Sequence, residues 1–177
     1  MRDLAALPHR LDPEQSICLA VVECPEGERG KFAYDPELGG FELKRLLPAG
    51  MAFPLNFGFV PSTKAEDGDP LDIMLIHDIP LPMGALTMVR LVGVIEAEQT
   101  ENGQTVRNDR LVGVTASSLI FADVRSFDDL PRHFIETLTA FWTQYEALRG
   151  VGFKILRKRN ASAACANVKR GARQAKG

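Results

Sequence analysis

The sequence has no apolar run close to the ~20 residues that a membrane-spanning helix requires, so we expect no membrane partner. Its N-terminus also lacks a secretory signal, because Pro8 and Arg10 interrupt any apolar stretch, and we expect a cytoplasmic location. Cysteine is scarce: Cys18, Cys24 and Cys165 have no metal-binding spacing. An odd number of cysteines in this context predicts reduced thiols rather than a disulfide framework.

Acidic residues are missing from the end of the chain. All 23 acids lie at or before Glu146, whereas nine of the 21 Lys and Arg lie from Arg149 onward. The body is therefore strongly acidic, and the tail over residues 158–177 is basic. A basic tail can bind nucleic acid or acidic lipid, or it can neutralise the acidic body of its own or a neighbouring subunit. We favour neutralisation.

The length of 177 residues and the hydrophobic content of 45% predict one domain over residues 1–177, with its core over about 16–157. Alternating or apolar runs bounded by turn residues predict strands. These strands are expected over 16–24, 31–34, 41–47, 73–76, 86–98, 104–115 and 151–156. Asn102-Gly103 predicts a tight hairpin turn. Many short strands with tight turns favour a barrel or a sandwich.

Helical periodicity occurs only late in the chain. Apolar residues at helical spacing predict one stripe, formed by Phe134, Leu138, Phe141, Tyr145 and Leu148. Acidic residues at 128 and 129 are candidate caps, Pro131 suits the first turn and Gly150 ends the helix. An Ala-rich second helix is expected over residues 161–175, within the basic tail.

The segment Glu66-Asp67-Gly68-Asp69-Pro70-Leu71-Asp72, which we call the acidic turn, concentrates four carboxylates in seven residues. Such acids repel one another unless water or a cation screens them. Gly68 and Pro70 exclude a helix and predict a stiff turn that leads into the apolar run at 73–76. Hard oxygen ligands on a stiff turn suit Mg²⁺ or Mn²⁺. The alternatives are a solvated acidic turn or an EF-hand loop, and the EF-hand spacing fails.

The acidic turn follows Phe53-Pro54-Leu55-Asn56-Phe57-Gly58-Phe59-Val60-Pro61, and together the two segments resemble the signature of the family I soluble inorganic pyrophosphatases. The resemblance covers roughly residues 16–157. It implies an α+β fold, a five-stranded OB-like β-barrel flanked by C-terminal helices. It also implies hydrolysis of pyrophosphate to two phosphates with Mg²⁺, Mn²⁺ being possible, and a homo-oligomer that in bacterial members is often a hexamer.

The resemblance assigns a role to each matched residue. Asp69 would be the catalytic base that takes a proton from the attacking water. The metal ligands would be Asp67, Asp72 and Glu23. Phosphate would be held by Lys31, Arg45 and Tyr145, and arginine suits this role because its fork binds phosphate oxygens in pairs. The alternative for each of these residues is a purely structural role, either as a solvated surface side chain or as a packed one.

The chain departs from the family pattern at several of these positions. Ala33 replaces a metal-associated Glu, Phe53 and Phe57 replace two tyrosines, and Glu146 replaces a Lys. In the hairpin before residue 111, Arg110 replaces the family Lys, which still suits phosphate. Asn108 replaces an Asp and can offer a metal only its carbonyl oxygen, and the first Asp of the motif falls near Gln99. Neighbouring acids could substitute for the lost ligands, namely Glu98, Glu101 and Asp109.

Three functions remain open from the sequence. The first is a divergent Mg²⁺-dependent pyrophosphatase of reduced activity. The second is a pyrophosphatase-fold hydrolase of another phosphate compound, or a catalytically weak or inactive paralogue that binds anion and metal. The third is a nucleic-acid-binding OB domain, which is disfavoured because acids beside the phenylalanines would repel a nucleic-acid backbone.

Overall fold

A computed structural model describes residues 3–176. Its strands are β1 (Ile17–Cys24), β2 (Gly30–Asp35), β3 (Gly40–Leu46), β4 (Asn56–Val60), β5 (Leu71–Ile76), β6 (Leu86–Glu101), β7 (Gln104–Arg107), β8 (Arg110–Thr115) and β9 (Gly152–Asn160). The helices are a short 3-10 turn η1 (Phe127–Asp129), α1 (Arg132–Leu148) and α2 (Ala161–Gln174). Neither of the two α-helices in this part of the chain is long and apolar enough to cross a membrane.

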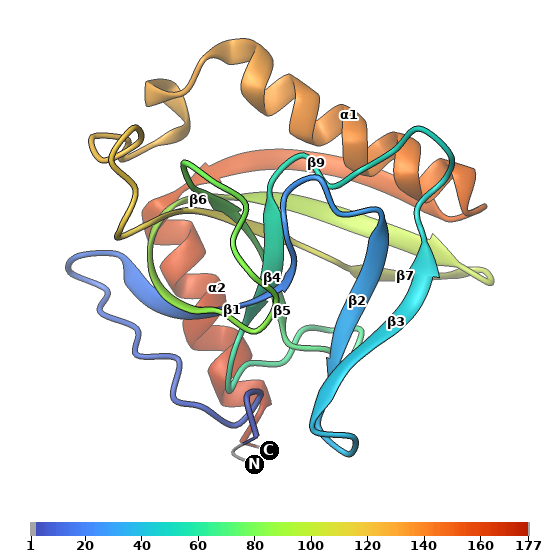
Figure 1. The fold of residues 1–177 in the computed structure, drawn as a ribbon, viewed down its shortest axis with the longest axis horizontal. Helices are drawn as coiled ribbons and strands as arrows, with labels where there is room; N and C mark the ends of the chain where they lie inside the picture. Colours follow the sequence, from blue (N-terminus) through green and yellow to red (C-terminus); the bar gives the residue numbers. More distant parts are fainter. Residues whose placement is uncertain (1–2, 177) are drawn as a thin grey trace.

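The strands β1, β4, β5, β8 and β6 pair in that order, and β6 pairs again with β1, which closes a five-stranded barrel (Figure 1). All pairs in the ring are antiparallel except β5 and β8, which run parallel. The predicted α+β barrel with C-terminal helices is therefore confirmed. The strand over β4 was missed because its aromatic and glycine residues give no clear alternation.

The apolar run over the last four residues of β5 is explained by burial on both faces of the strand. Met74 and Ile76 pack in one core cluster with α1, whereas Ile73 and Leu75 pack in a second cluster with α2. Successive side chains of a strand point to opposite faces, so a strand between two cores must be apolar at every position. This double burial anchors the acidic turn, which enters β5 at Leu71.

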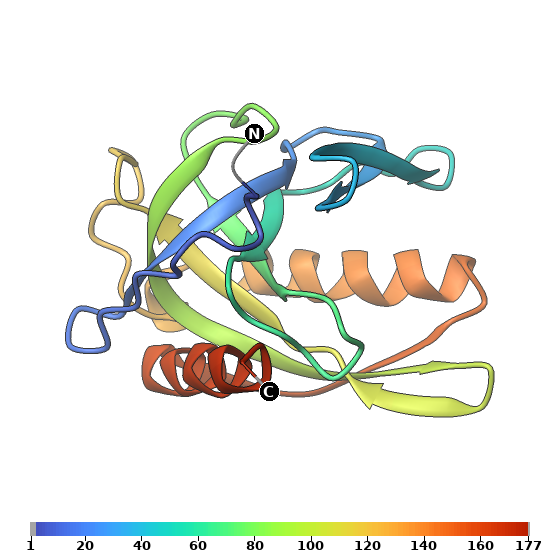
Figure 2. The ribbon, with the colours of Figure 1, turned by 90° about the horizontal axis from the view of Figure 1, so that it is seen from below.

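Two hairpins extend from the barrel. The strands β2 and β3 form a separate two-stranded sheet, which we call the β2–β3 ribbon (Figure 1). The end of β6 and β7 form the second hairpin, which projects past the barrel (Figure 2). Its turn has positive φ at Asn102 and Gly103, as predicted. The single strand expected over 104–115 is wrong: residues 108 and 109 separate β7 from β8.

The buried face of α1 differs from the predicted stripe. Leu138 and Tyr145 are buried as expected, but the face is completed by Ile135 and Trp142, and Leu148 is 55% exposed. Asp128 and Asp129 do not cap α1. They belong to η1, where Ser126 and Asp129 form a capping box, and Pro131 precedes the first residue of α1.

The C-terminal segment is part of the folded body. The strand β9 pairs with β6, and α2 begins where the side chain of Asn160 accepts a hydrogen bond from the Ala163 N–H at 3.1 Å. The helix expected over 161–175 is confirmed, and Cys165 and Val168 on it are buried in the second core cluster. All three cysteines are free, and all three are buried.

Candidate active site

The acidic turn holds its carboxylates at the entrance to β5. Gly68 has φ of +97°, which its lack of a side chain permits, and the Asp69 N–H donates to Asp67 Oδ1 at 3.2 Å. Partial desolvation, and then the charge of Asp72, raise the pKa of Asp67 to about 6. The same two causes raise the pKa of Asp69, against the opposing effect of nearby Lys31 and Lys44. The negative charge of Asp72 therefore acts on both Asp67 and Asp69.

Asp72 meets Arg110 through the parallel pairing of β5 with β8. Ile73 lies opposite Leu111, so the residues before them are neighbours. Arg110 Nη1 lies 2.7 Å from Asp72 Oδ2. Arg110 is 3% exposed, and its guanidinium carbon lies 4.6 Å from the ring centre of Trp142. Within residues 3–176 its Nε has no hydrogen-bond partner, so this buried donor is available to an added acceptor.

Glu23 lies at the end of β1 and touches the β2–β3 ribbon. Its carboxylate accepts a hydrogen bond from Lys31 Nζ at 3.2 Å and another from the Tyr34 N–H at 2.8 Å. Burial raises the pKa of Glu23 in spite of these two contacts, and Asp72 adds to the rise. Lys31 Nζ also lies 4.2 Å from the ring centre of Phe57. Phe57 lacks the hydroxyl of the family tyrosine, but its ring still stabilises the ammonium group of Lys31.

Arg45 and Lys31 are paired across the β2–β3 ribbon, so both side chains leave the same face. Arg45 Nε donates to the hydroxyl of Tyr145 at 2.9 Å, which links the ribbon to α1. Glu146 is 2% exposed and accepts a hydrogen bond from Arg149. Burial raises its pKa, while the charges of Arg149, Arg110 and Arg45 lower it. Residue 146, where the family pattern has a Lys, is therefore a Glu that lies among arginines.

The residues expected to complete the metal site are engaged elsewhere. Asn108 Nδ2 donates to Gln99 Oε1 at 2.7 Å, and its side-chain oxygen accepts from Arg110. Asp109 is turned toward α2, where Asn167 Nδ2 donates to its Oδ2 at 2.8 Å. Asp109 is therefore not a free replacement ligand. The other two candidates also lie in the β6–β7 hairpin: Glu98 opposite Arg107 and Lys154, and Glu101 at its exposed end.

Within residues 3–176, no three His, Cys, Asp or Glu side chains lie close enough together to form a ready metal site. The donor chemistry nevertheless suits a hard divalent cation, because Asp67, Asp69 and Asp72 supply carboxylate oxygens and repel one another. A cation placed among them would relieve that repulsion. The metal roles of these residues, of Glu23 and of Asn108 stay predictions.

Sequence reasoning missed two supports of the site. Trp142 carries the Arg110 guanidinium on its ring, and Asn167 holds Asp109 behind the strand that Arg110 begins. The signal for Trp142 was its spacing of three and four residues from Tyr145 and Leu138, which place it on the same helical face. Nothing in the sequence indicates that Asn167 meets Asp109, because this contact depends on how α2 packs.

Known proteins resemble this chain over nearly its full length. A model of the inorganic pyrophosphatase family matches residues 20–176. The inorganic pyrophosphatase of Thermus thermophilus is 33% identical over 172 residues, which are 96% of this chain and 95% of that protein. That of Geobacillus stearothermophilus is 34% identical over 137 residues, covering 77% of this chain and 81% of the relative.

Solved structures agree with the sequence comparison. The crystal structure of the Thermus thermophilus inorganic pyrophosphatase superposes with a TM-score of 0.90 at 32% identity, and covers 99% of this chain and 100% of its own. An inorganic pyrophosphatase from Neisseria gonorrhoeae has the same TM-score at 28% identity, with the same coverage. With a matching family model, relatives above 30% identity and this fold, the chain belongs to the inorganic pyrophosphatase family.

Proposed function

We propose that the protein hydrolyses inorganic pyrophosphate to two phosphates with a divalent cation, Mg²⁺ or Mn²⁺. The observation that carries the proposal is the alternation of charge in one site: Lys31 beside Glu23, and Arg110 beside Asp72. Pyrophosphate brings a dense negative charge that needs fixed cations, and the acids retain the metal that accompanies it. Family membership supports this substrate above other phosphate compounds.

The chain's own residues would divide the reaction as follows. Lys31, Arg45 and Arg110 would bind phosphate oxygens, and the hydroxyl of Tyr145 would orient Arg45 or donate to the substrate. The carboxylate of Asp69, which its surroundings make more basic than a free Asp, would accept the proton of the attacking water. Asp67 and Asp72, with Glu23 and Asn108, would hold the cation. When bound, this cation supplies charge neutralisation and acidifies a coordinated water.

A second function is favoured by the contacts of Arg110. Its ion pair with Asp72 and its hydrogen bond with Asn108 occupy two predicted metal ligands. A site closed in this way would bind phosphate-like anions with little turnover, or act on another phosphate compound.

The homo-oligomer, a hexamer by resemblance, also remains a prediction. The apolar side chains of Leu119 and Ile120 are exposed, and we propose that such residues contact a second subunit.

The test is phosphate release from pyrophosphate as a function of Mg²⁺ and Mn²⁺ concentration, beside a panel of phosphate monoesters and nucleoside triphosphates. We expect cation-dependent release from pyrophosphate at a higher kcat/KM than from any panel compound. Release no faster than that of the Asp69→Asn variant would reject pyrophosphate hydrolysis, and faster release from an ester would select the second function.

The cation requirement is expected to depend on pH. The pKa of Asp67 is raised to about 6, so below that pH its carboxylate binds a proton in competition with the cation. With one competing proton, the half-saturating Mg²⁺ concentration should rise about tenfold per pH unit below pH 6. Mg²⁺ titrations of phosphate release at pH 5 to 8 measure this. In Asp67→Asn the requirement should be higher throughout and flatter near pH 6, whereas equal wild-type requirements at pH 5 and pH 7 would contradict the assignment.

A further inference from the structure

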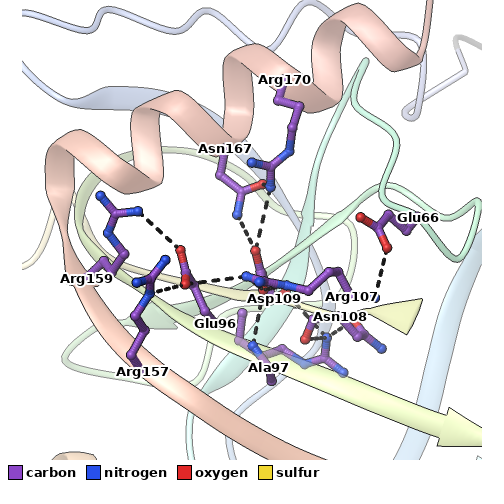
Figure 3. A network of polar contacts seen from close by, with 11 residues as sticks. Glu66, Glu96, Ala97, Arg107, Asn108, Asp109, Arg157, Arg159, Asn167 and Arg170 are labelled. Carbon is purple, nitrogen blue, oxygen red and sulfur yellow. Dashed lines mark hydrogen bonds and ion pairs between the residues drawn. The ribbon is translucent and has the colours of Figure 1, made fainter. Parts of the chain in front are cut away.

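A buried carboxylate lies between two predicted site residues but faces away from the site. Asp109 is 8% exposed and follows Asn108 and precedes Arg110. Its Oδ1 accepts from the Ala97 N–H at 3.1 Å and from Arg107 Nη2 at 2.8 Å (Figure 3). Since Arg110 begins β8 directly after Asp109, the hydrogen bonds that hold the Asp109 carboxylate also restrict the backbone from which the Arg110 side chain extends.

The other oxygen of Asp109 is held by α2. Asn167, 4% exposed, donates from Nδ2 to Asp109 Oδ2 at 2.8 Å, and Arg170 Nη2 lies 3.7 Å from the same oxygen. Arg170 also donates to Asn167 Oδ1 at 2.8 Å, which fixes the orientation of the amide (Figure 3). A single polar contact chain therefore connects the helix to the segment that presents Arg110.

The same helix also touches the support of the acidic turn, one turn further along. The Lys64 N–H donates to Gly171 O at 3.0 Å, and a Cβ at Gly171 would lie 2.7 Å from Leu71 Cδ1. The backbone of α2 at Gly171 therefore packs directly against the Leu71 side chain, and this contact leaves no room for a methyl group at residue 171. The hairpin and the turn are also joined directly, since the Arg107 N–H donates to Glu66 Oε2 at 3.0 Å.

We propose that Asp109 and Asn167 are positioning residues, through which α2 sets where Arg110 lies relative to Asp72 and hence how tightly the site binds phosphate. The proposal rests on the proposed function insofar as Arg110 is taken as a phosphate-binding group. One helix holds both the segment that carries the cation and the base of the acidic turn. The basic tail thereby has a role beyond neutralising the acidic body.

Exchanging the side chains of Asp109 and Asn167 tests their hydrogen bond separately from the general packing of α2 against the barrel. In Asp109→Asn, one amide nitrogen would face the donor of Asn167 and the charge beside Arg107 would be lost. The double variant D109N/N167D restores a donor facing an acceptor, keeps the net charge, and places the new carboxylate beside Arg170. Small displacements of a binding group cost about 10- to 100-fold in function, so we expect phosphate affinity to fall about tenfold in Asp109→Asn and to recover in large part in the double variant.

The probe is inorganic phosphate, and the readout is the fluorescence of Trp142, the one tryptophan of the chain, whose ring lies 4.6 Å from the Arg110 guanidinium. Dissociation constants for phosphate and KM for pyrophosphate are compared across the wild type, Asp109→Asn, Asn167→Ala and the double variant. The matched control is Arg159→Gln, which removes the ion pair of the exposed Arg159 with Glu96 at 3.5 Å and contacts neither Asp109 nor Asn167. We expect this control to bind phosphate as the wild type does.

Weaker phosphate binding in both single variants, with recovery in the double variant, supports the proposal. Unchanged phosphate affinity in Asp109→Asn and Asn167→Ala overturns it, even if their melting temperatures fall, because that result assigns the contact to stability alone. If Asp109→Asn does not fold, Asn167→Ala decides, since it leaves the remaining hydrogen bonds of Asp109 in place. A wild type that binds phosphate but releases none from pyrophosphate would contradict the proposed hydrolysis, and the affinity comparison would still decide on α2.

Discussion

Replacing Asp69 by Asn is expected to lower the rate of phosphate release from pyrophosphate by about 10²- to 10⁴-fold, the usual contribution of a positioned general base. The amide keeps the shape of the side chain but cannot accept a proton from water. The raised pKa of Asp69, caused by partial desolvation and by the charge of Asp72, makes the native carboxylate a stronger base than a free Asp. Steady-state release at saturating Mg²⁺ measures the effect, which should fall on kcat rather than on KM.

The matched control is Glu14→Gln, which removes one acid from the exposed turn before β1 and should leave the rate unchanged. The comparison separates the loss of a base from the loss of a negative charge. An Asp69→Asn protein that hydrolyses pyrophosphate at the wild-type rate would remove Asp69 from the base role. Another group of the acidic turn would then have to accept the proton.

Replacing Arg110 by Met is expected to lower the free energy of unfolding by about 3 kcal/mol, because breaking a buried ion pair leaves an unpaired charge. The Asp72 side chain is 23% exposed, which places the expected loss at the lower end of the range for such pairs. Phosphate affinity should fall together with stability. The pKa of Asp67, raised to about 6 by partial desolvation and by Asp72 and lowered in part by Arg110, should rise further.

The informative companion is Arg110→Lys, which keeps the charge and loses the planar contact with Trp142. We expect a smaller loss of stability, on the order of 1 kcal/mol, corresponding to the stacking contact. Urea unfolding followed by circular dichroism measures both variants. Equal stability of Arg110→Met and the wild type would show that Asp72 is stabilised by other groups.

Much of the fold could be predicted from local pattern, since turn residues and apolar runs give β1 to within one residue, the apolar end of β5 and the turn of the β6–β7 hairpin. The failures have physical causes. The predicted face of α1 was partly wrong because the phenylalanines of the helix suggested a stripe, whereas the buried face includes Trp142, which contacts Phe53 and Phe57. The break at residues 108 and 109 was missed because it is imposed by packing against α2.

The same distinction between local sequence pattern and long-range packing applies to the candidate site. The acidic turn could be read from seven consecutive residues, because glycine, proline and carboxylates constrain the chain locally. The pairing of Asp72 with Arg110 depends on the parallel register of β5 and β8, which brings together residues far apart in the sequence. Asn167 lies still further along the chain and carries no motif at all.

The separation of the β2–β3 ribbon from the barrel has an evolutionary consequence. Lys31 and Arg45 lie on a small sheet whose second strand is largely exposed, whereas Glu23 and Asp72 lie on strands of the barrel. Under the proposed function, substitutions at the exposed positions of β3 can therefore alter which anion is preferred with little effect on the hydrophobic interior. A lineage built on this barrel could then change its substrate by exchanging the two cations that we propose as phosphate-binding groups, while selection for folding acts elsewhere.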